Sequence, residues 1–239
     1  MAITGMTGAV YVSDVNAAPV SFTDKPCTGD SERKRYRIDD PDLRYWDPSV
    51  PVLVEVNGAS VATGFKLEGA GGYVGFKEAL STGAEVTVSG QALTMVQAGG
   101  FFNWSIDTDA IDEDATDFES GGWKEFVRTL NGWSGSAEAF WGDYRFFDSL
   151  GKTVVVKLFT DAGEAQGCLE GFAVITGEGI ESPVEGLVEE SIDFQGTGPL
   201  YIRMDEEEVL GAGMQAVGIP DGEIPDDENE DNGGGADEE

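Results

Sequence analysis

Small or apolar residues alternate with polar ones in the stretch Trp133-Ser134-Gly135-Ser136-Ala137-Glu138-Ala139-Phe140-Trp141. In a β-strand, successive side chains point to opposite faces, so residues two apart share a face. One face of this stretch carries Trp133, Gly135, Ala137, Ala139 and Trp141. The other carries Ser134, Ser136 and Glu138. The pattern predicts a strand that is buried on its tryptophan face.

Other parts of the chain repeat this period of two. Residues 102–107 place Phe102, Trp104 and Ile106 on one side, and residues 191–195 do the same with Ile192 and Phe194. Val154-Val155-Val156 fits a strand buried on both faces. In residues 52–56, Val52, Val54 and Val56 alternate with other residues and lead into Asn57-Gly58, a strong hairpin signal because both residues tolerate positive φ. We expect a return strand with Val61, Phe65 and Leu67.

Two segments have helical spacing instead. Trp123, Phe126, Val127 and Leu130 lie at i, i+3, i+4 and i+7, which predicts one face of a short helix. A second helix is predicted over 143–150, closed by Gly151 as its C-cap. The 34 Gly and 9 Pro suit a protein with many turns. The predicted fold class is mainly β, a β-sandwich or barrel with one or two short helices.

Composition divides the 239 residues into three regions. Residues 1–90 are rich in predicted hairpins, and residues 91–204 are predicted to form the β-sandwich core. Residues 205–239 are acidic and of low complexity, with too few apolar side chains to offset the entropy of ordering, so this segment is predicted to be disordered.

The charge of −32 excludes some classes of partner. Residues 221–239 hold ten acids and no Lys or Arg, which leaves −32 + 10 = −22 for residues 1–220. Affinity for nucleic acid and for anionic lipid depends on Lys and Arg, so tight binding to DNA or to a membrane is not expected. No apolar run approaches the roughly 20 residues that span a bilayer. The first residues have no secretory pattern, and we expect the chain to be made and folded in a cytoplasm.

Few residues suit catalysis or a cofactor, and no cofactor is expected. The chain has no His, which excludes the usual nucleophilic triads. Cys27 and Cys168 have no zinc spacing, and two thiols are favoured over a disulfide. Glu138 between Trp133 and Trp141 resembles a glycosidase cleft, but the alternation places it on the opposite face from both tryptophans. A carboxylate-based glycosidase is therefore the least favoured alternative, and the chain is predicted not to be an enzyme.

An acidic segment is the first candidate interface. It contains Asp107, Asp109, Asp112, Glu113, Asp114, Asp117 and Glu119. An EF-hand loop starting at Asp107 fails, because Ile111, Asp112 and Phe118 occupy positions that need an oxygen ligand, a glycine and an oxygen ligand. A solvated loop or a subunit contact is favoured, and an irregular cation site stays open.

The dense basic stretch around Tyr36 is the second candidate. It consists of Arg33, Lys34, Arg35 and Arg37. Our hypothesis is that it meets the acidic segment of a neighbouring copy, a contact between different patches that closes into rings or continues as filaments. A solvated face and pairing within the chain are the alternatives.

Five motifs in order resemble those of the major tail tube proteins of long-tailed (siphovirus-type) bacteriophages. They cover roughly residues 91–201 and read Gly122-Trp123-Lys124-Glu125-Phe126, Gly132-Trp133-Ser134-Gly135-Ser136-Ala137-Glu138, Glu170-Gly171-Phe172-Ala173-Val174-Ile175-Thr176, Pro183-Val184-Glu185-Gly186 and Phe194-Gln195-Gly196-Thr197-Gly198-Pro199-Leu200. Arg44-Tyr45-Trp46-Asp47-Pro48 is similar to the N-terminal part of some members.

The resemblance implies a structural virion protein. Its copies would form hexameric rings that stack into a hollow tube for genome ejection, with other tail proteins at the tube ends and a tape-measure protein inside. DNA would pass without specific binding. The loop near 107–122, including Trp123, would reach a neighbouring subunit or ring, and the location would be the phage tail, assembled in the host cytoplasm. The alternative from another class is an acidic, cation-dependent, adhesin-like β-binding module of a virion or cell surface.

Overall fold

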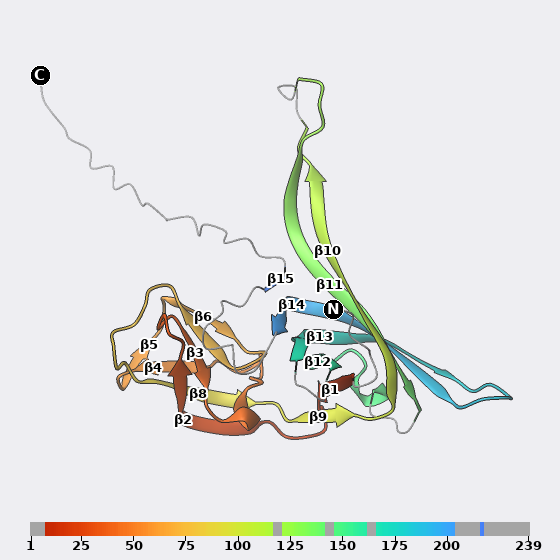
Figure 1. Cartoon of the computed structure of the whole chain (residues 1–239), viewed down its shortest axis with the longest axis horizontal. Helices are drawn as coiled ribbons and strands as arrows, with labels where there is room; N and C mark the ends of the chain where they lie inside the picture. Colours follow the sequence, from red (N-terminus) through yellow and green to blue (C-terminus); the bar gives the residue numbers. More distant parts are fainter. Residues whose placement is uncertain (1–7, 117–120, 142–145, 162–165, 204–215, 218–239) are drawn as a thin grey trace, which may run out of the picture.

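The computed structural model describes residues 8–116, 121–141, 146–161, 166–203 and 216–217, which form two β-sheets set side by side (Figure 1). The main sheet has eight strands, one of which, β15 (Ala216–Val217), pairs only with β14. The order of the others is β10 (Phe101–Asp114), β11 (Phe126–Phe140), β14 (Glu189–Arg203), β13 (Gln166–Glu181), β12 (Thr153–Asp161), β1 (Ala9–Ser13) and β9 (Met95–Ala98). All of its pairings are antiparallel.

The second sheet has seven antiparallel strands. Their order is β5 (Ala59–Val61), β4 (Leu53–Val56), β8 (Val86–Ala92), β2 (Val20–Gly29), β3 (Arg35–Ile38), β7 (Tyr73–Phe76) and β6 (Phe65–Glu68). Each sheet has its own apolar core. Trp133 and Phe194 lie in the core of the main sheet, and Trp46 and Ile38 lie in the core of the second.

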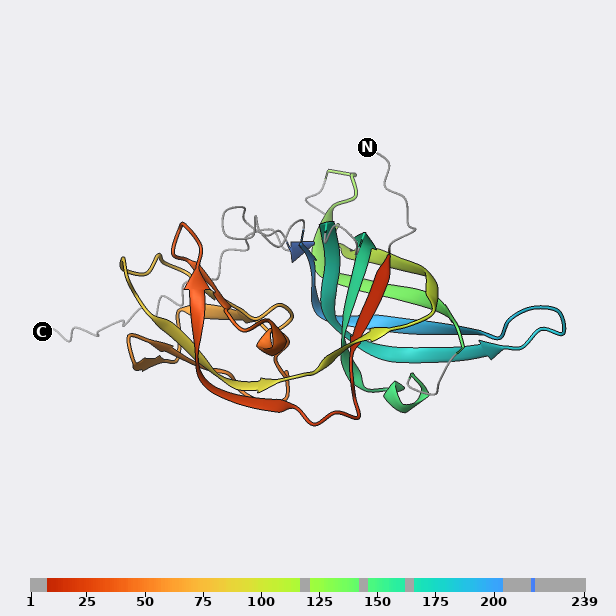
Figure 2. The same cartoon turned by 60° about the horizontal axis from the view of Figure 1, so that its bottom comes forward.

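The second sheet is an insertion into the main one. β1 and β9 pair directly in the main sheet, with Ser13 opposite Met95. The Asp14 N–H donates to the Thr94 carbonyl at 2.9 Å. The chain therefore leaves the main sheet after β1, builds what we call the inserted sheet, and returns beside its point of departure (Figure 2). The division into 1–90, 91–204 and 205–239 stays a prediction, and β1, from the first of these regions, pairs in the main sheet.

The mainly β fold class is confirmed, and most of the alternation that predicted it is found. The exception is Phe102, because a register shift between Phe101 and Asn103 leaves Phe102 exposed and packs Phe101 against the core with Trp104 and Ile106. Trp133, Ala137 and Ala139 are buried in β11, and Ile192 and Phe194 are buried in β14. The run 154–156 is buried on both faces. Asn57 and Gly58 turn β4 into β5 with φ of 53° and 74°. The return strand ends at Val61, because Phe65 and Leu67 belong to β6, which pairs with β7.

The helix predicted over 123–130 is wrong. β11 begins at Phe126, and Phe126, Val127 and Leu130 pair with Asp114, Glu113 and Ile111 of β10. A short amphipathic helix is stabilised by a core under its apolar face, and here these side chains are exposed. Of the segment 143–150, residues 143–145 lie outside the described residues, and η3 (Phe147–Ser149) is a 3₁₀ turn. A further 3₁₀ turn, η2 (Pro41–Leu43), buries Leu43 in the inserted sheet.

Candidate functional site

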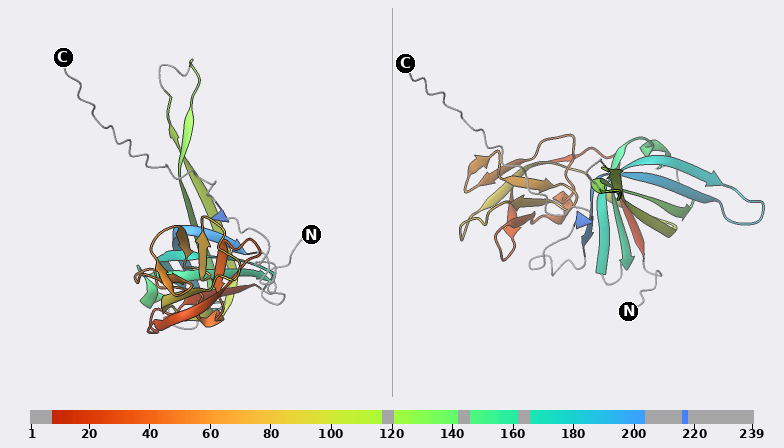
Figure 3. Two further views of the ribbon diagram at one scale, coloured as in Figure 1. Left: turned by 90° about the vertical axis from the view of Figure 1, so that its left-hand side faces the viewer. Right: turned by 90° about the horizontal axis from the view of Figure 1, so that it is seen from above.

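The β10–β11 hairpin extends beyond the main sheet. β11 begins to pair with β14 only at Ser134, so residues 108–114 and 126–133 form a two-stranded ribbon, which we call the arm. The arm stands away from both sheets in perpendicular views (Figures 1 and 3). The segment 107–114 was expected to be part of a loop and is instead strand, because its backbone pairs with β11 along its whole length.

The predicted acidic residues lie along this hairpin. Asp107 is at the base of the arm, and Asp109, Asp112, Glu113 and Asp114 follow on it, all exposed. Asp117 and Glu119 lie outside the described residues. Hydrogen bonds from the Thr116 side chain and backbone lower the pKa of Asp114, whose Oδ2 lies 3.7 Å from the Lys124 Nζ. In the part of the chain that the structure describes, no group of three or more His, Cys, Asp or Glu is arranged to hold a metal ion.

Large apolar side chains are also exposed on the arm. Trp123, at its turn, is 81% exposed. Ile111, Phe126, Val127 and Leu130 are each about half exposed or more. A two-stranded ribbon is marginally stable alone in water, and a contiguous apolar surface usually marks a contact site. The exposed apolar side chains make the arm a candidate for a contact with another protein surface.

The solvent face of β10, β11 and β14 is a regular array of polar side chains. The register aligns three rows, Asn103–Glu138–Ser191, Ser105–Ser136–Asp193 and Asp107–Ser134–Gln195. We call these nine residues the polar grid. Asn103 Nδ2 donates to Glu138 Oε2 at 2.9 Å, and the Ser105 and Ser136 hydroxyls lie 3.0 Å apart. Gly177 and Gly179 of β13 extend two of the rows with no side chain at all.

The polar grid carries negative charge and no cation. Asp107, Glu138 and Asp193 are its acids, and the sequence holds no Lys or Arg in 101–123, 129–144 or 166–202. Its back is apolar, because Trp133, Ile192 and Phe194 point into the core from the same strands. The result is an acidic surface backed by the apolar core of the main sheet.

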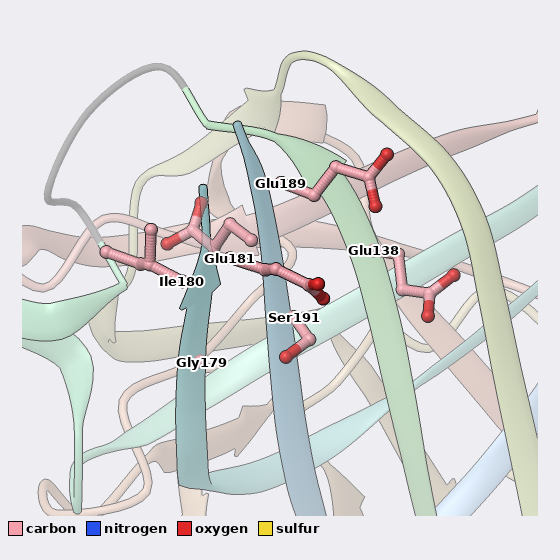
Figure 4. A pocket seen from close by; sticks show the side chains of 7 residues that line it. Glu138, Gly179, Ile180, Glu181, Glu189 and Ser191 are labelled. Atoms are coloured by element: carbon pink, nitrogen blue, oxygen red, sulfur yellow. The ribbon is translucent and has the colours of Figure 1, made fainter. Parts of the chain in front are cut away.

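A pocket of about 310 Å³ lies at one end of this face (Figure 4). It is lined by Glu138, Gly179, Ile180, Glu181, Glu189, Glu190 and Ser191. Glu181 and Glu189 are directly opposed across β13 and β14, a like-charge pair that destabilises a ladder. None of the lining residues is aromatic, and Trp133 is buried behind the sheet, so this pocket lacks the sugar-stacking surface of a glycosidase cleft.

The four residues of the predicted basic stretch fall into two pairs, one with partners inside the chain and one exposed to solvent. Arg35 forms an ion pair with Glu68 and stacks on the Tyr73 ring at 3.9 Å, and Arg37 Nε donates to the Gly71 carbonyl. Both arginines are therefore used within the chain. Arg33 and Lys34 are exposed at the turn between β2 and β3. Of the four residues, only these two are placed to meet another molecule.

A buried ion network joins the two sheets, and sequence reasoning missed it. Glu170 of β13 is 1% exposed and forms an ion pair with Arg203 of β14. From the inserted sheet side, the Tyr45 hydroxyl donates to Glu170 at 2.9 Å, and Arg203 Nη2 donates to the Ala70 carbonyl at 2.6 Å. Burial alone would raise the pKa of Glu170, but the charges of Arg203 and Lys157 and the hydrogen bonds from Arg203 and Tyr45 lower it overall. Sequence alone gave no signal, because these residues are far apart in the chain.

Two further findings concern chemistry and membranes. Cys27 lies in β2 and Cys168 in β13, and both are thiols. Burial, with the charge of Asp39, raises the pKa of Cys27 to about 12, which keeps it protonated and poorly nucleophilic at neutral pH. Within the described ranges, no helix has the length and apolar character to cross a membrane.

Comparisons with known proteins give matches among solved structures. No family model and no curated protein matches the chain. A chain from the tail of an empty gene transfer agent particle with C6 symmetry is 21% identical with a TM-score of 0.35, covering 45% of this chain and 84% of that one. A chain from the virion of a native gene transfer agent particle is 21% identical with a TM-score of 0.36, covering 46% and 88%. The SPP1 tail tube is 16% identical with a TM-score of 0.37, covering 69% and 84%.

Proposed function

We propose that this chain is a major tail tube subunit of a bacteriophage, a structural protein that stacks as hexameric rings into a hollow conduit for genome ejection. The observation that carries the proposal is the polar grid, an acidic surface backed by the apolar core of the main sheet. The five sequence motifs over residues 91–201 point to the same role.

The polar grid has the chemistry that the wall of a DNA conduit needs. Protein affinity for DNA comes mainly from Lys and Arg contacts to phosphates, and this surface has neither. Its carboxylates repel phosphates at close range, since the Debye length at physiological salt is about 8 Å. Four of its nine residues are serines with short side chains, and Gly177 and Gly179 beside it have none, which leaves few projections on which a passing polymer could catch.

The rest of the main sheet suits polymerisation. Its two edge strands, β10 and β9, have backbone groups available to a neighbouring copy, and such edges pair readily. The arm offers exposed apolar side chains at a distance from the sheet. In this role the protein lies in the phage tail after assembly in the host cytoplasm, and it contacts other tail proteins at the tube ends and a tape-measure protein inside.

Electron microscopy of the purified protein at rising concentration tests the proposal. We expect hollow cylinders or rings of uniform diameter. A variant with Phe126→Asp and Leu130→Asp should keep the melting temperature of the wild type and lose the cylinders, because these side chains are exposed in the isolated subunit. A protein that stays monomeric at every concentration, or cylinders whose inner wall proves basic, would refute the tube role.

The acidic segment 221–239 is placed outside the tube in this proposal, because inside it would crowd both itself and the DNA. Truncation after Pro220 should leave cylinders of unchanged inner diameter in electron micrographs. Loss of all polymerisation in that truncation would contradict this placement.

A further inference from the structure

The inserted sheet carries four of the six Lys and Arg side chains that are exposed in the described part of the chain. The exposed Lys and Arg side chains of the described residues are Arg33, Lys34, Lys66, Lys77, Lys124 and Lys152, and the first four of these six lie on β6, at the β2–β3 turn and just after β7. We call Arg33, Lys34, Lys66 and Lys77 the basic patch.

Backbone contacts hold the basic patch together. Gly75 is opposite Arg35 on one side and opposite Lys66 on the other, so Lys66 of β6 is two strands away from the start of β3, which directly follows Arg33 and Lys34. The Phe76 N–H donates to the Lys34 carbonyl at 2.7 Å, and the Leu80 N–H donates to the Arg33 carbonyl at 2.9 Å. The Lys77 N–H donates to the Gly64 carbonyl, two residues from Lys66.

The cations of the basic patch remain available to another molecule. The ion pairs seen in the described part of the chain engage Lys25, Arg35, Lys124, Lys157 and Arg203, and none involves the patch. Arg33 donates to the Thr82 hydroxyl at 2.6 Å and keeps its charge. Asp30 is occupied in its own turn by the Lys34 N–H, and two exposed acids, Glu32 and Glu78, flank the patch.

The arm has the complementary charge. Asp109, Asp112, Glu113 and Asp114 are exposed along one strand of it, with Asp107 at its base. Two cations belong to the arm, Lys124 beside Asp114 and Arg128 opposite Asp112 in the register, so its acids outnumber its cations. The arm's exposed apolar side chains independently require a partner surface. Within one copy the arm rises beside the inserted sheet without reaching it, as the perpendicular views show (Figures 1 and 3), so a contact between the arm and the basic patch needs a second molecule.

We infer that the basic patch of the inserted sheet binds the acidic arm of a second copy of this chain. The inference rests on the proposed tube role and deepens it, by naming the surface that receives the arm. It also replaces Arg35 and Arg37, which the chain uses internally, with Lys66 and Lys77. Contacts between two different patches of identical copies propagate, as a stacked assembly needs.

Charge reversal in the full chain tests this contact. One variant reverses the patch (Arg33→Glu, Lys34→Glu, Lys66→Glu, Lys77→Glu), and a second reverses the arm (Asp109→Lys, Asp112→Lys, Glu113→Lys). Each should lose the cylinders seen for wild type in electron micrographs, and a variant carrying both sets should regain them, because opposite charges face each other again. Lys152→Glu, an exposed cation of the main sheet, is the matched control and should assemble like wild type.

Melting temperatures close to wild type will show that the variants fold. If wild type and the patch-reversed variant form cylinders equally well, the proposed contact between patch and arm is refuted and the tube role stands. The same holds if the combined variant forms no more cylinders than either single variant. If wild type forms no cylinders, the tube role fails and the contact fails with it. A second readout is carbodiimide cross-linking of a mixture of ¹⁵N-labelled and unlabelled protein. Mixed-isotope cross-links from Lys34, Lys66 or Lys77 to arm carboxylates are expected, and same-isotope Lys124–Asp114 links serve as the internal control.

Discussion

The Tyr45 hydroxyl donates a hydrogen bond to Glu170 that joins the inserted sheet to the main sheet, and 125 positions separate the two residues in sequence. Glu170 is also bound by Arg203, which reaches back to the Ala70 carbonyl. A buried carboxylate is costly unless it is paired and hydrogen-bonded, and here both conditions are met. The interface between the sheets is thus held by a few polar residues that depend on one another.

Removing single members of this network should destabilise the fold to different extents. Glu170→Gln leaves the Arg203 guanidinium buried without its carboxylate and should lower the free energy of unfolding by about 3–5 kcal/mol. Tyr45→Phe removes one hydrogen bond to a charged group and should cost about 1.5–3 kcal/mol. Urea denaturation measures both changes in unfolding free energy. The exposed Glu113→Gln is the control, and its change should be close to zero. A Glu170→Gln variant as stable as wild type would contradict the network's role.

The network also predicts a dependence on pH. The pKa of Glu170 is lower in the folded chain than in the unfolded chain, so its stabilising contribution is complete above the unfolded value of about 4.3 and is lost as pH falls through the folded value. The difference in unfolding free energy between wild type and Glu170→Gln should therefore stay constant at higher pH and shrink below about pH 4. Comparing the two proteins cancels the effect of the other carboxylates. A difference in unfolding free energy between the two proteins that grows as the pH falls would contradict a lowered pKa for Glu170.

Gly196 should not tolerate a methyl group. A Cβ at this position would overlap the Trp133 indole, which is 4% exposed and packed in the core. Gly196→Ala should cost about 1–3 kcal/mol as an overpacked site. Gly132→Ala, one residue before Trp133, meets nothing within 4 Å and is the matched control. Thermal unfolding by circular dichroism measures both. If the smaller ring of Trp133→Phe does not relieve the Gly196→Ala defect, the overlap is not its cause.

Excision of residues 14–94 separates folding from assembly. Because Ser13 is opposite Met95, an Asn-Gly turn can join β1 to β9 as a two-residue hairpin. The shortened chain should fold with a β-type circular dichroism spectrum and a cooperative melt. It should assemble poorly at physiological salt, because it lacks the basic patch. A chain that fails to fold would show that the main sheet is not independent of its insertion.

The period-2 patterns were sufficient to predict parts of three strands of the main sheet, β10, β11 and β14. Trp133, Ile192 and Phe194 face the core as their alternation predicts. A strand that is buried on one face needs apolar residues at every second position, and that pattern can be seen in a short stretch of sequence. The spacing from Trp123 to Leu130 predicted a helix that does not form, because exposed apolar residues on an arm can match a helical period by chance. Spacing alone does not say whether a core lies beneath them.

The candidate surfaces were only partly predictable. The acidic segment was identified because its charges are consecutive, whereas Lys66 and Lys77 join Arg33 and Lys34 only through the pairing of β3, β7 and β6. The insertion was equally hidden, because the pairing of β1 with β9 spans most of the first hundred residues. Long-range register carries this information, and one sequence does not reveal it.

The bond from Tyr45 to Glu170 has a geometric consequence for any polymer of this chain. Together with the bond from Arg203 to the Ala70 carbonyl, it joins the inserted sheet to the main sheet and so contributes to the position of the basic patch relative to the arm. Where the arm of one copy meets the patch of the next, that position sets the angular step from copy to copy. The pitch of the whole filament would then depend on a tyrosine that no neighbouring subunit touches.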